Sequence, residues 1–147
     1  MGENTRLFLI DAGGKETLNL GVESFTPYNQ IFENGKTVSF NARIKNYSAQ
    51  PVRNSVASLF VNGKRSAQQS VNLSGGQTKE FSFETTLSDT GLVEFEVELE
   101  DDEILQDNKR YLSVYVPDNI SVLIIADNTD DAKYLRLAVD DPSLKTR

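Results

Sequence analysis

The sequence contains no cysteine, no histidine and no tryptophan. Without cysteine the chain has neither disulfides nor thiolate nucleophiles. Without histidine it lacks the usual general base at neutral pH and a common ligand of zinc and copper. What remains is carboxylate, lysine, hydroxyl or tyrosine chemistry, or metal binding through oxygen atoms alone. We therefore predict a protein that is not an enzyme and that uses no cofactor.

Long apolar runs and an excess of positive charge are also missing. No apolar stretch approaches the roughly 18 residues of a membrane-spanning helix, so we expect no direct membrane insertion of this segment. The first four residues lack the basic and apolar regions of a signal peptide. The net charge of −7 argues against nucleic acid as a partner, because nucleic acid attracts cationic surfaces.

The charges that are present are separated along the chain. Between Lys36 and Arg65 there are six basic residues and no acidic residue, whereas Lys79 to Asp107 holds eleven acidic residues and one basic residue. We therefore expect opposite charges to lie on different strands.

Apolar and polar residues alternate with a period of two along most of the chain, which is typical of antiparallel strands with one buried face. The clearest stretch is Val38 to Ile44, and Asn62-Gly63 is typical of a tight hairpin turn. The pattern predicts about seven strands, with turn residues roughly every 8 to 12 positions, and a short leading strand before them. The predicted strands are 7–10 (leading), 18–25, 38–44, 56–61, 66–73 (at an edge), 80–87, 93–99 and 111–116.

The fold class that follows is mostly β, an immunoglobulin-like antiparallel sandwich over residues 1–117, with residues 1–17 as a leading segment. After Pro117 the pattern changes. Ile120 to Ala126 is nearly continuously apolar, as in a strand buried on both faces of a parallel sheet.

A helical pattern follows this apolar run, with Ala132, Leu135, Ala138 and Val139 at helical spacing. We predict that residues 118–147 are the β-α start of a second, truncated α/β domain. Asp127, Asp130 and Asp131 lie where such domains bind ligands, but helix capping explains them as well. Because exposed apolar faces tend to be covered, we expect docking on the sandwich or a homo-oligomer formed through residues 120–140.

Several pieces of the sequence resemble a known family. They are Leu9 to Gly13 with Asn19 to Val22, Asp107 to Tyr111 leading into Val114 to Pro117, and Val122 to Ile125 followed by Tyr134 to Leu137. These pieces resemble the C-terminal periplasmic region of BatA-like bacterial membrane proteins. The sandwich itself is similar to the cell-adhesion-related domain found in bacteria (CARDB).

The resemblance implies a larger, membrane-anchored protein on the periplasmic or extracellular side of the bacterial envelope. In such proteins a von Willebrand factor A domain precedes the immunoglobulin-like segment, and an α/β domain like a class I glutamine amidotransferase follows it. The Asp-x-Ser-x-Ser metal site of the first and the cysteine and histidine of a working amidotransferase are both missing from this sequence, so neither chemistry carries over.

One strand carries a row of carboxylates on a single face. Alternation places these side chains about 7 Å apart, where neighbours repel by about 0.6 kcal/mol in water, which is tolerable without a partner. Lys109, or Arg53 and Lys64, would flank this strand in a sandwich. Both a plain solvated face and a surface that binds a basic partner stay open. The candidate interaction face consists of Glu94, Glu96, Glu98, Glu100, Tyr111 and Tyr115.

The loop before the last predicted strand is also acidic. Asp101, Asp102 and Asp107 are candidate Ca²⁺ ligands, because calcium prefers hard oxygen atoms. The loop lacks the Asp-x-Asp-x-Asp-Gly spacing, however, and Asp107-Asn108 are typical turn residues that satisfy local amides. We predict a solvated turn without a metal, with calcium as the alternative.

The sequence therefore predicts a non-catalytic interaction or spacer module of a bacterial envelope protein. Its expected partner is another protein or a neighbouring domain of the same chain. The alternative is a carbohydrate or cell-surface adhesion module, which requires exposed tyrosines gathered on one face. The candidates for that role are Tyr28, Tyr47, Tyr111 and Tyr115.

Overall fold

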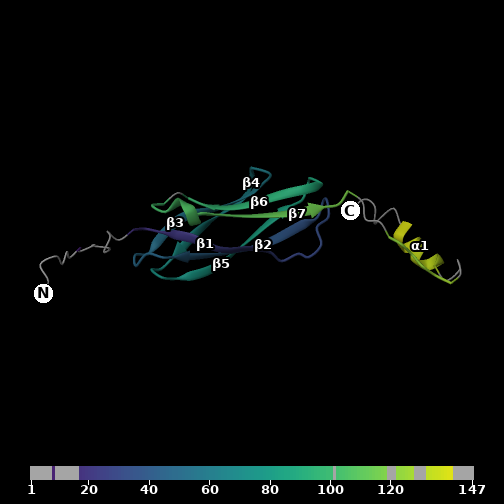
Figure 1. Ribbon diagram of the computed structural model, residues 1–147, viewed down its shortest axis with the longest axis horizontal. Coiled ribbons are helices and arrows are strands. Elements are labelled where there is room, and N and C mark those ends of the chain that lie inside the picture. Colours follow the sequence, from purple (N-terminus) through teal and green to yellow (C-terminus); the bar gives the residue numbers. More distant parts are fainter. Residues whose placement is uncertain (1–7, 9–16, 101, 119–121, 128–131, 141–147) are drawn as a thin grey trace, which may run out of the picture.

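The computed structural model describes residues 8, 17–100, 102–118, 122–127 and 132–140. This part of the chain forms two antiparallel sheets packed as a sandwich, with strand orders β1-β2-β5 and β4-β3-β6-β7 (Figure 1). The predicted immunoglobulin-like sandwich of about seven strands is confirmed. The strands are β1 (Leu20–Pro27), β2 (Thr37–Asn46), β3 (Val52–Val61), β4 (Lys64–Leu73), β5 (Thr78–Thr86), β6 (Gly91–Leu99) and β7 (Lys109–Val116).

The core lies between the inward rows of the two sheets. Phe40 of β2 and Phe95 of β6 meet across it with ring centroids 4.5 Å apart, and Phe25 of β1 stacks on Phe40 at 5.3 Å. The alternation seen in the sequence is thus confirmed, because every second residue of β2 and β6 points into the core. The buried residues of these two strands are Val38, Phe40, Ala42, Ile44, Val93, Phe95, Val97 and Leu99.

The chain enters the sandwich at one end and leaves it at the other. The backbone amide of Leu20, at the start of β1, donates to Asp102 in the β6–β7 connection. Val116, at the end of β7, pairs with Gly91 at the opposite end of β6. Figure 1 shows the start of β1 and the end of β7 at opposite ends of the two sheets.

The β3–β4 hairpin turns at Asn62-Gly63, as predicted. Asn62 has a φ of 47° and Gly63 a φ of 75°, the left-handed pair that a type I′ turn requires. The Asn62 side-chain oxygen also accepts a hydrogen bond from the Glu94 backbone amide at 3.0 Å, and its side-chain nitrogen donates to Asp89 at 2.8 Å. The tip of the hairpin is therefore tied to the start of β6.

Strand β3 begins at Val52, four residues before the predicted start at Val56. The ladder with β4 is irregular between Val52 and Ser55, and Asn54 takes a left-handed φ of 59° while its amide donates to Asn72. This bulge interrupts the alternation, which is why the sequence pattern missed the first part of the strand. Strand β4 lies at a sheet edge, as predicted.

Asn46, at the end of β2, is completely buried and joins three parts of the fold. Its amide nitrogen donates to the backbone oxygens of Gln50 at 2.7 Å and Ser74 at 3.1 Å. Its side-chain oxygen accepts the amide of Ser48 at 3.0 Å. One side chain thus holds the β2–β3 loop against the end of β4 (Leu73) and the turn that follows it.

The segment after Pro117 agrees with its prediction only in part. The predicted helix is present as α1 (Lys133–Asp140), but residues 122–127, the described part around the predicted strand, belong to no strand. A parallel-type strand needs neighbouring strands for its backbone hydrogen bonds, and β1 to β7 pair only with one another. Of the predicted strand at 7–10, only Phe8 is described, and it is exposed and outside any strand. Asp130 and Asp131 lie outside the described residues.

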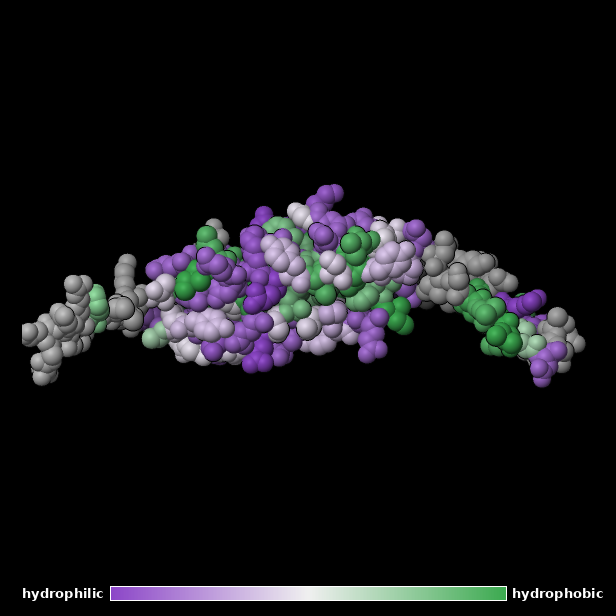
Figure 2. Space-filling model, viewed as in Figure 1, coloured by the Kyte–Doolittle hydropathy of each residue, from purple (hydrophilic) through white to green (hydrophobic). Residues whose placement is uncertain are grey.

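Several apolar side chains of this segment are exposed. Leu123 and Ile125 are among the most exposed large apolar residues, and Figure 2 shows hydrophobic residues together at the end of the molecule that holds α1. Such a surface favours contact with another domain or another molecule. No helix in the described part of the chain is long and apolar enough to cross a membrane.

Candidate interaction face

The carboxylate row of β6 lies on the outer face of the four-stranded sheet. Glu94, Glu96 and Glu98 point away from the core because they alternate with the buried residues of the same strand. Glu100 directly follows β6, and one of its carboxylate oxygens accepts the amide of Val56 at 3.3 Å. The structure thus brings Glu94, Glu96 and Glu98 to the outer face, between β3 and β7, whereas Glu100 lies at the end of β6 and lines the cavity described below.

Lys109 forms ion pairs with the two middle carboxylates of this row. Its Nζ lies 2.5 Å from Glu98 Oε1 and 3.1 Å from Glu96 Oε1, and its side chain is 41% exposed. Hydrogen bonds to Glu98 and then to Glu96 raise the pKa of Lys109, against a smaller lowering by burial. Among the described residues, the other two expected neighbours, Arg53 and Lys64, form no ion pair with the row.

Tyr111 and Tyr115 lie on the same outer face. Tyr111 pairs with Glu96 in the β6–β7 register, and Tyr115 pairs with Leu92. The two tyrosines are 68% and 69% exposed, and Leu92 is 66% exposed. An apolar cross-strand pair therefore lies beside Glu94, which is exposed and has no ion pair in the described part of the chain.

Sequence reasoning had not included Leu92 in the candidate face. The signal for it was present, because Leu92 has the same parity as Glu94 and so stands at an outward position of β6. We call the combined surface the acidic-tyrosine face. It consists of Leu92, Glu94, Glu96, Glu98, Lys109, Tyr111 and Tyr115.

The four tyrosines of the adhesion alternative do not gather on one face. Tyr28 and Tyr47 follow β1 and β2 of the three-stranded sheet, whereas Tyr111 and Tyr115 belong to β7 of the other sheet. Tyr47 donates to Glu23 at 3.4 Å and lies under the ammonium group of Lys45. Burial and then the charge of Glu23 raise the pKa of Tyr47. The adhesion alternative requires exposed tyrosines on one face, and these four are divided between the two sheets.

The acidic loop between β6 and β7 contains the 3₁₀ helix η1 (Leu105–Asp107) and is fastened to β1. Asp102 accepts the amide of Leu20 at 2.6 Å and that of Ile104 at 2.9 Å. Asp107 accepts the side-chain amide of Asn19 at 3.2 Å. Carboxylates of this loop accept hydrogen bonds from nearby amide groups, as predicted. The backbone amides bind Asp102, whereas Asp107 binds the side-chain amide of Asn19. Asp101 lies outside the described residues.

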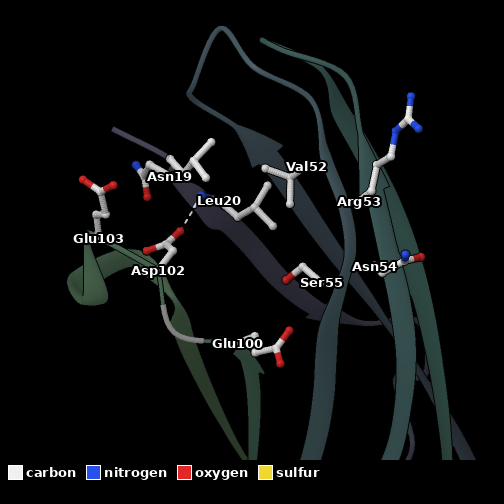
Figure 3. Close-up of a pocket in the computed structure, with 10 residues that line it drawn as sticks. Asn19, Leu20, Val52, Arg53, Asn54, Ser55, Glu100, Asp102 and Glu103 are labelled. Carbon is white, nitrogen blue, oxygen red and sulfur yellow. Dashed lines mark hydrogen bonds between the residues drawn. The ribbon is translucent and has the colours of Figure 1, made fainter. Parts of the chain in front are cut away.

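An open cavity of about 460 Å³ lies between this loop, β1 and β3 (Figure 3). Leu20 and Val52 contribute apolar walls, and Glu100, Glu103 and Arg53 contribute charged residues to the lining. In the described part of the chain no group of three or more His, Cys, Asp or Glu side chains is arranged to hold a metal ion.

Comparison with known families decides which domain this is. The family model CARDB matches residues 17–109, which is more than half of the chain and runs from just before β1 to the start of β7. The chain belongs to the CARDB family. CARDB domains are β-sandwich modules without catalytic activity, so the predicted class of module is confirmed at this level. A comparison with curated proteins gives no match.

Solved structures with the same fold include another CARDB domain. The crystal structure of the CARDB domain of a Pyrococcus furiosus protein, in complex with di-metal ions, has a TM-score of 0.62 and 16% identity, and the match covers 71% of this chain and 97% of that one. The solution NMR structure of the same Pyrococcus furiosus domain gives a TM-score of 0.62 at 17% identity, over 70% of this chain and 98% of that chain. At these identities the likeness concerns the fold.

A β-glucosidase from Erythrobacter marinus contains a similar sandwich. It matches with a TM-score of 0.56 and 11% identity, over 67% of this CARDB chain but only 15% of the glucosidase chain. The similarity therefore concerns a small part of that enzyme and transfers no activity.

Proposed function

We propose that this CARDB domain is a non-catalytic interaction module that binds a protein partner, or a neighbouring domain of its own chain, through the acidic-tyrosine face. The observation that carries the proposal is the exposed pair of Leu92 and Tyr115 beside the unpaired carboxylate of Glu94. Exposed tyrosines with an apolar neighbour are typical of protein interfaces. A strand face that contacts only solvent gains nothing from exposed apolar and aromatic side chains.

The charges of the acidic-tyrosine face indicate which side chains a partner would present. Lys109 already pairs with Glu96 and Glu98, so among the carboxylates of this face Glu94 is the one left without an ion pair. A partner that fits would present an apolar side chain to Leu92 and Tyr115 and a lysine or arginine to Glu94. Charge pairs of this kind set specificity and association rate more than affinity.

The larger setting is a spacer role in a bacterial envelope protein. The resemblance of residues 107–117 and 122–125 to BatA-like proteins supports a membrane-anchored chain, with this domain between a von Willebrand factor A domain and an amidotransferase-like α/β domain on the periplasmic or extracellular side. The opposite positions of the start of β1 and the end of β7 support a spacer, because such a module holds its neighbours apart. A full-length gene without a von Willebrand factor A domain or transmembrane helices would count against this setting.

A second candidate function is carbohydrate binding, favoured by the two exposed rings of β7. Tyr111 and Tyr115 are four residues apart on one strand face, which separates them by about 13 Å, and Glu94 offers a hydrogen-bond acceptor nearby. Aromatic rings of this kind can stack on the apolar faces of sugars. Only two of the four candidate tyrosines belong to this strand face.

Site-directed photocrosslinking in the native envelope tests the proposal. A photoreactive amino acid at position 115 should give a discrete crosslinked protein product or an interdomain crosslink. The matched control at position 28, an exposed tyrosine of the other sheet, should not. Equal crosslinking at both positions would show that the face is an ordinary solvated surface. Glycan-array binding that disappears in a Tyr111→Ala/Tyr115→Ala variant would favour carbohydrate instead.

A further inference from the structure

Three buried oxygen atoms without a hydrogen-bond partner occur together where β1 meets the β6–β7 connection. They are the side-chain Oδ1 atoms of Asn19, Asp107 and Asn108. Asn19 is 9% exposed and Asn108 is 1% exposed. A buried acceptor that has lost its water costs folding free energy unless something else satisfies it. Three such atoms on adjacent or hydrogen-bonded residues therefore point to a ligand at this end of the sandwich.

Hydrogen bonds join these residues into one cluster. The amide nitrogen of Asn19 donates to Asp107 Oδ2 at 3.2 Å, and Asn108 follows Asp107 directly. The amide nitrogen of Asn108 donates to Asp102 Oδ1 at 3.3 Å. Figure 3 shows the Asn19 side chain on the same side of β1 as Asp102, with its oxygen turned toward the Asp102 carboxylate. The one other unpaired buried side-chain atom of the described chain is Asn41 Oδ1, on β2.

The side-chain nitrogens of both asparagines are occupied by carboxylates. The Asn108 nitrogen donates to Asp102 Oδ1 and the Asn19 nitrogen to Asp107 Oδ2, so both amide oxygens remain as acceptors. Rotating the Asn108 amide by half a turn would place its oxygen against Asp102 Oδ1, where two acceptors repel each other. The nearest lysine along the chain, Lys109, is held by Glu96 and Glu98.

We propose that Asn19, Asp107 and Asn108 bind a calcium ion through these three oxygen atoms, with Asp102 positioning Asn108 and β1. Amide and carboxylate oxygens are the ligands that calcium prefers, and calcium accepts an irregular set of them. Magnesium keeps more of its own water and demands a regular octahedron, so it fits this set less well. The neighbouring open cavity has room for the water molecules that complete the coordination.

The ion joins the two sheets at the end where the chain enters. Asn19 immediately precedes β1 of the three-stranded sheet, and Asp107 and Asn108 connect β6 to β7 of the four-stranded sheet. Because the ion binds only the folded arrangement of these residues, calcium should raise the unfolding temperature in proportion to its occupancy. This role is independent of the acidic-tyrosine face.

Calorimetric titration of the chelator-treated chain with calcium chloride tests the site, with magnesium chloride as a parallel arm. We expect one ion per chain, with a dissociation constant on the order of 0.1 to 1 mM, as in extracellular modules, and weaker binding of magnesium. The Asp107→Asn variant should bind calcium at least tenfold more weakly. Asn108→Asp should bind more tightly, because it adds a charge at a ligand position.

Two matched controls separate this site from general attraction to acidic residues. Glu103→Gln removes a charge from the neighbouring cavity, and Asn41→Asp places a charge at the buried unpaired acceptor outside the cluster. Neither should change calcium affinity or the calcium-dependent rise in unfolding temperature by more than twofold. The proposal is overturned if calcium gives neither binding heat nor a higher unfolding temperature than the same concentration of magnesium. It is also overturned if Asp107→Asn and Glu103→Gln weaken binding equally, since the ion would then be held by surface charge alone.

Discussion

Lys109 stands directly opposite Glu98 in the β6–β7 register, and its Nζ lies 2.5 Å from Glu98 Oε1. The same ammonium group also contacts Glu96 at 3.1 Å. The row of carboxylates on β6 is therefore not a uniform field of negative charge. Its two middle carboxylates share one lysine of the same domain, and Glu94 is left open beside the apolar pair of Leu92 and Tyr115.

Replacing Lys109 by methionine should destabilise the domain modestly. The substitution removes the cation that Glu96 and Glu98 share, but the lysine side chain is 41% exposed, so solvent screens these ion pairs and the loss should be about 0.5 to 1 kcal/mol. Urea denaturation at low salt measures it. The difference between wild type and variant should shrink in 1 M salt, whereas an unchanged difference would mean that packing of the lysine stem is responsible. Lys64→Met, without an ion pair to the row, is the control.

The same pair predicts a dependence of stability on pH. The folded domain raises the pKa of Lys109 above its ordinary value of 10.5, because hydrogen bonds to Glu98 and Glu96 favour the charged form. Stabilisation by the pair is therefore complete below pH 10.5 and decreases as the pH rises through the folded pKa. Denaturation curves of wild type and Lys109→Met should converge in this alkaline range. Curves that stay equally far apart at every pH would rule out this origin.

Replacing Asn46 by alanine should cost about 2 to 4 kcal/mol of unfolding free energy, because it removes the buried hydrogen bonds that join the β2–β3 loop to the β4–β5 turn and takes away the acceptor of the Ser48 amide. The side chain is completely buried and donates to Gln50 and Ser74. Chemical denaturation measures the loss. Asn34→Ala, at an exposed loop position, should change stability by less than about 0.5 kcal/mol. Comparable effects of the two substitutions would contradict the role given to Asn46.

Replacing Gly75 by alanine should destabilise the domain by about 1 to 3 kcal/mol, through a steric clash. A methyl group at this position would overlap the backbone carbonyl of Ala49, which cannot rotate away as a side chain can. Thermal and urea denaturation would both show the loss. Ser74→Ala changes a neighbouring small residue in the same turn and is the control. A Gly75→Ala variant as stable as wild type would mean that the two loops can separate without cost.

The exposed apolar residues after Pro117 predict self-association. We expect the chain to exceed the monomer mass in light scattering at high concentration, and a Leu123→Asp/Ile125→Asp variant to return to the monomer, because charges in an apolar contact are costly. Leu105→Asp, at an exposed position in η1, is the control and should have no effect. A wild-type chain that stays monomeric at all concentrations would contradict the prediction.

Alternation alone was enough to predict the sandwich. The two faces of β2, β5 and β6 differ so clearly in polarity that their inward residues could be named from the sequence. The first part of β3 was missed because the bulge at Asn54 breaks the period. Residues 122–126 have the composition of a buried strand, but composition supplies no partner strand.

The sequence could predict which site residues share a face only where those residues belong to one strand. Glu94, Glu96 and Glu98 share a strand, so their common face followed from their spacing. The cluster of Asn19, Asp107 and Asn108 could not be found in this way, because its hydrogen bond between Asn19 and Asp107 joins residues 88 positions apart. Nothing local to Asn19 indicates that it meets an acidic loop from the opposite sheet.

The route of the chain through the sandwich also determines how the domain would respond to being pulled. Tension between neighbours on either side would enter at the start of β1 and leave at the end of β7, along the strands. The backbone hydrogen bonds of β1 with β2, and of β7 with β6, would then be sheared together, and they could not open one after another like a zipper. A domain stretched in this direction should resist force better than one pulled from two ends on the same side.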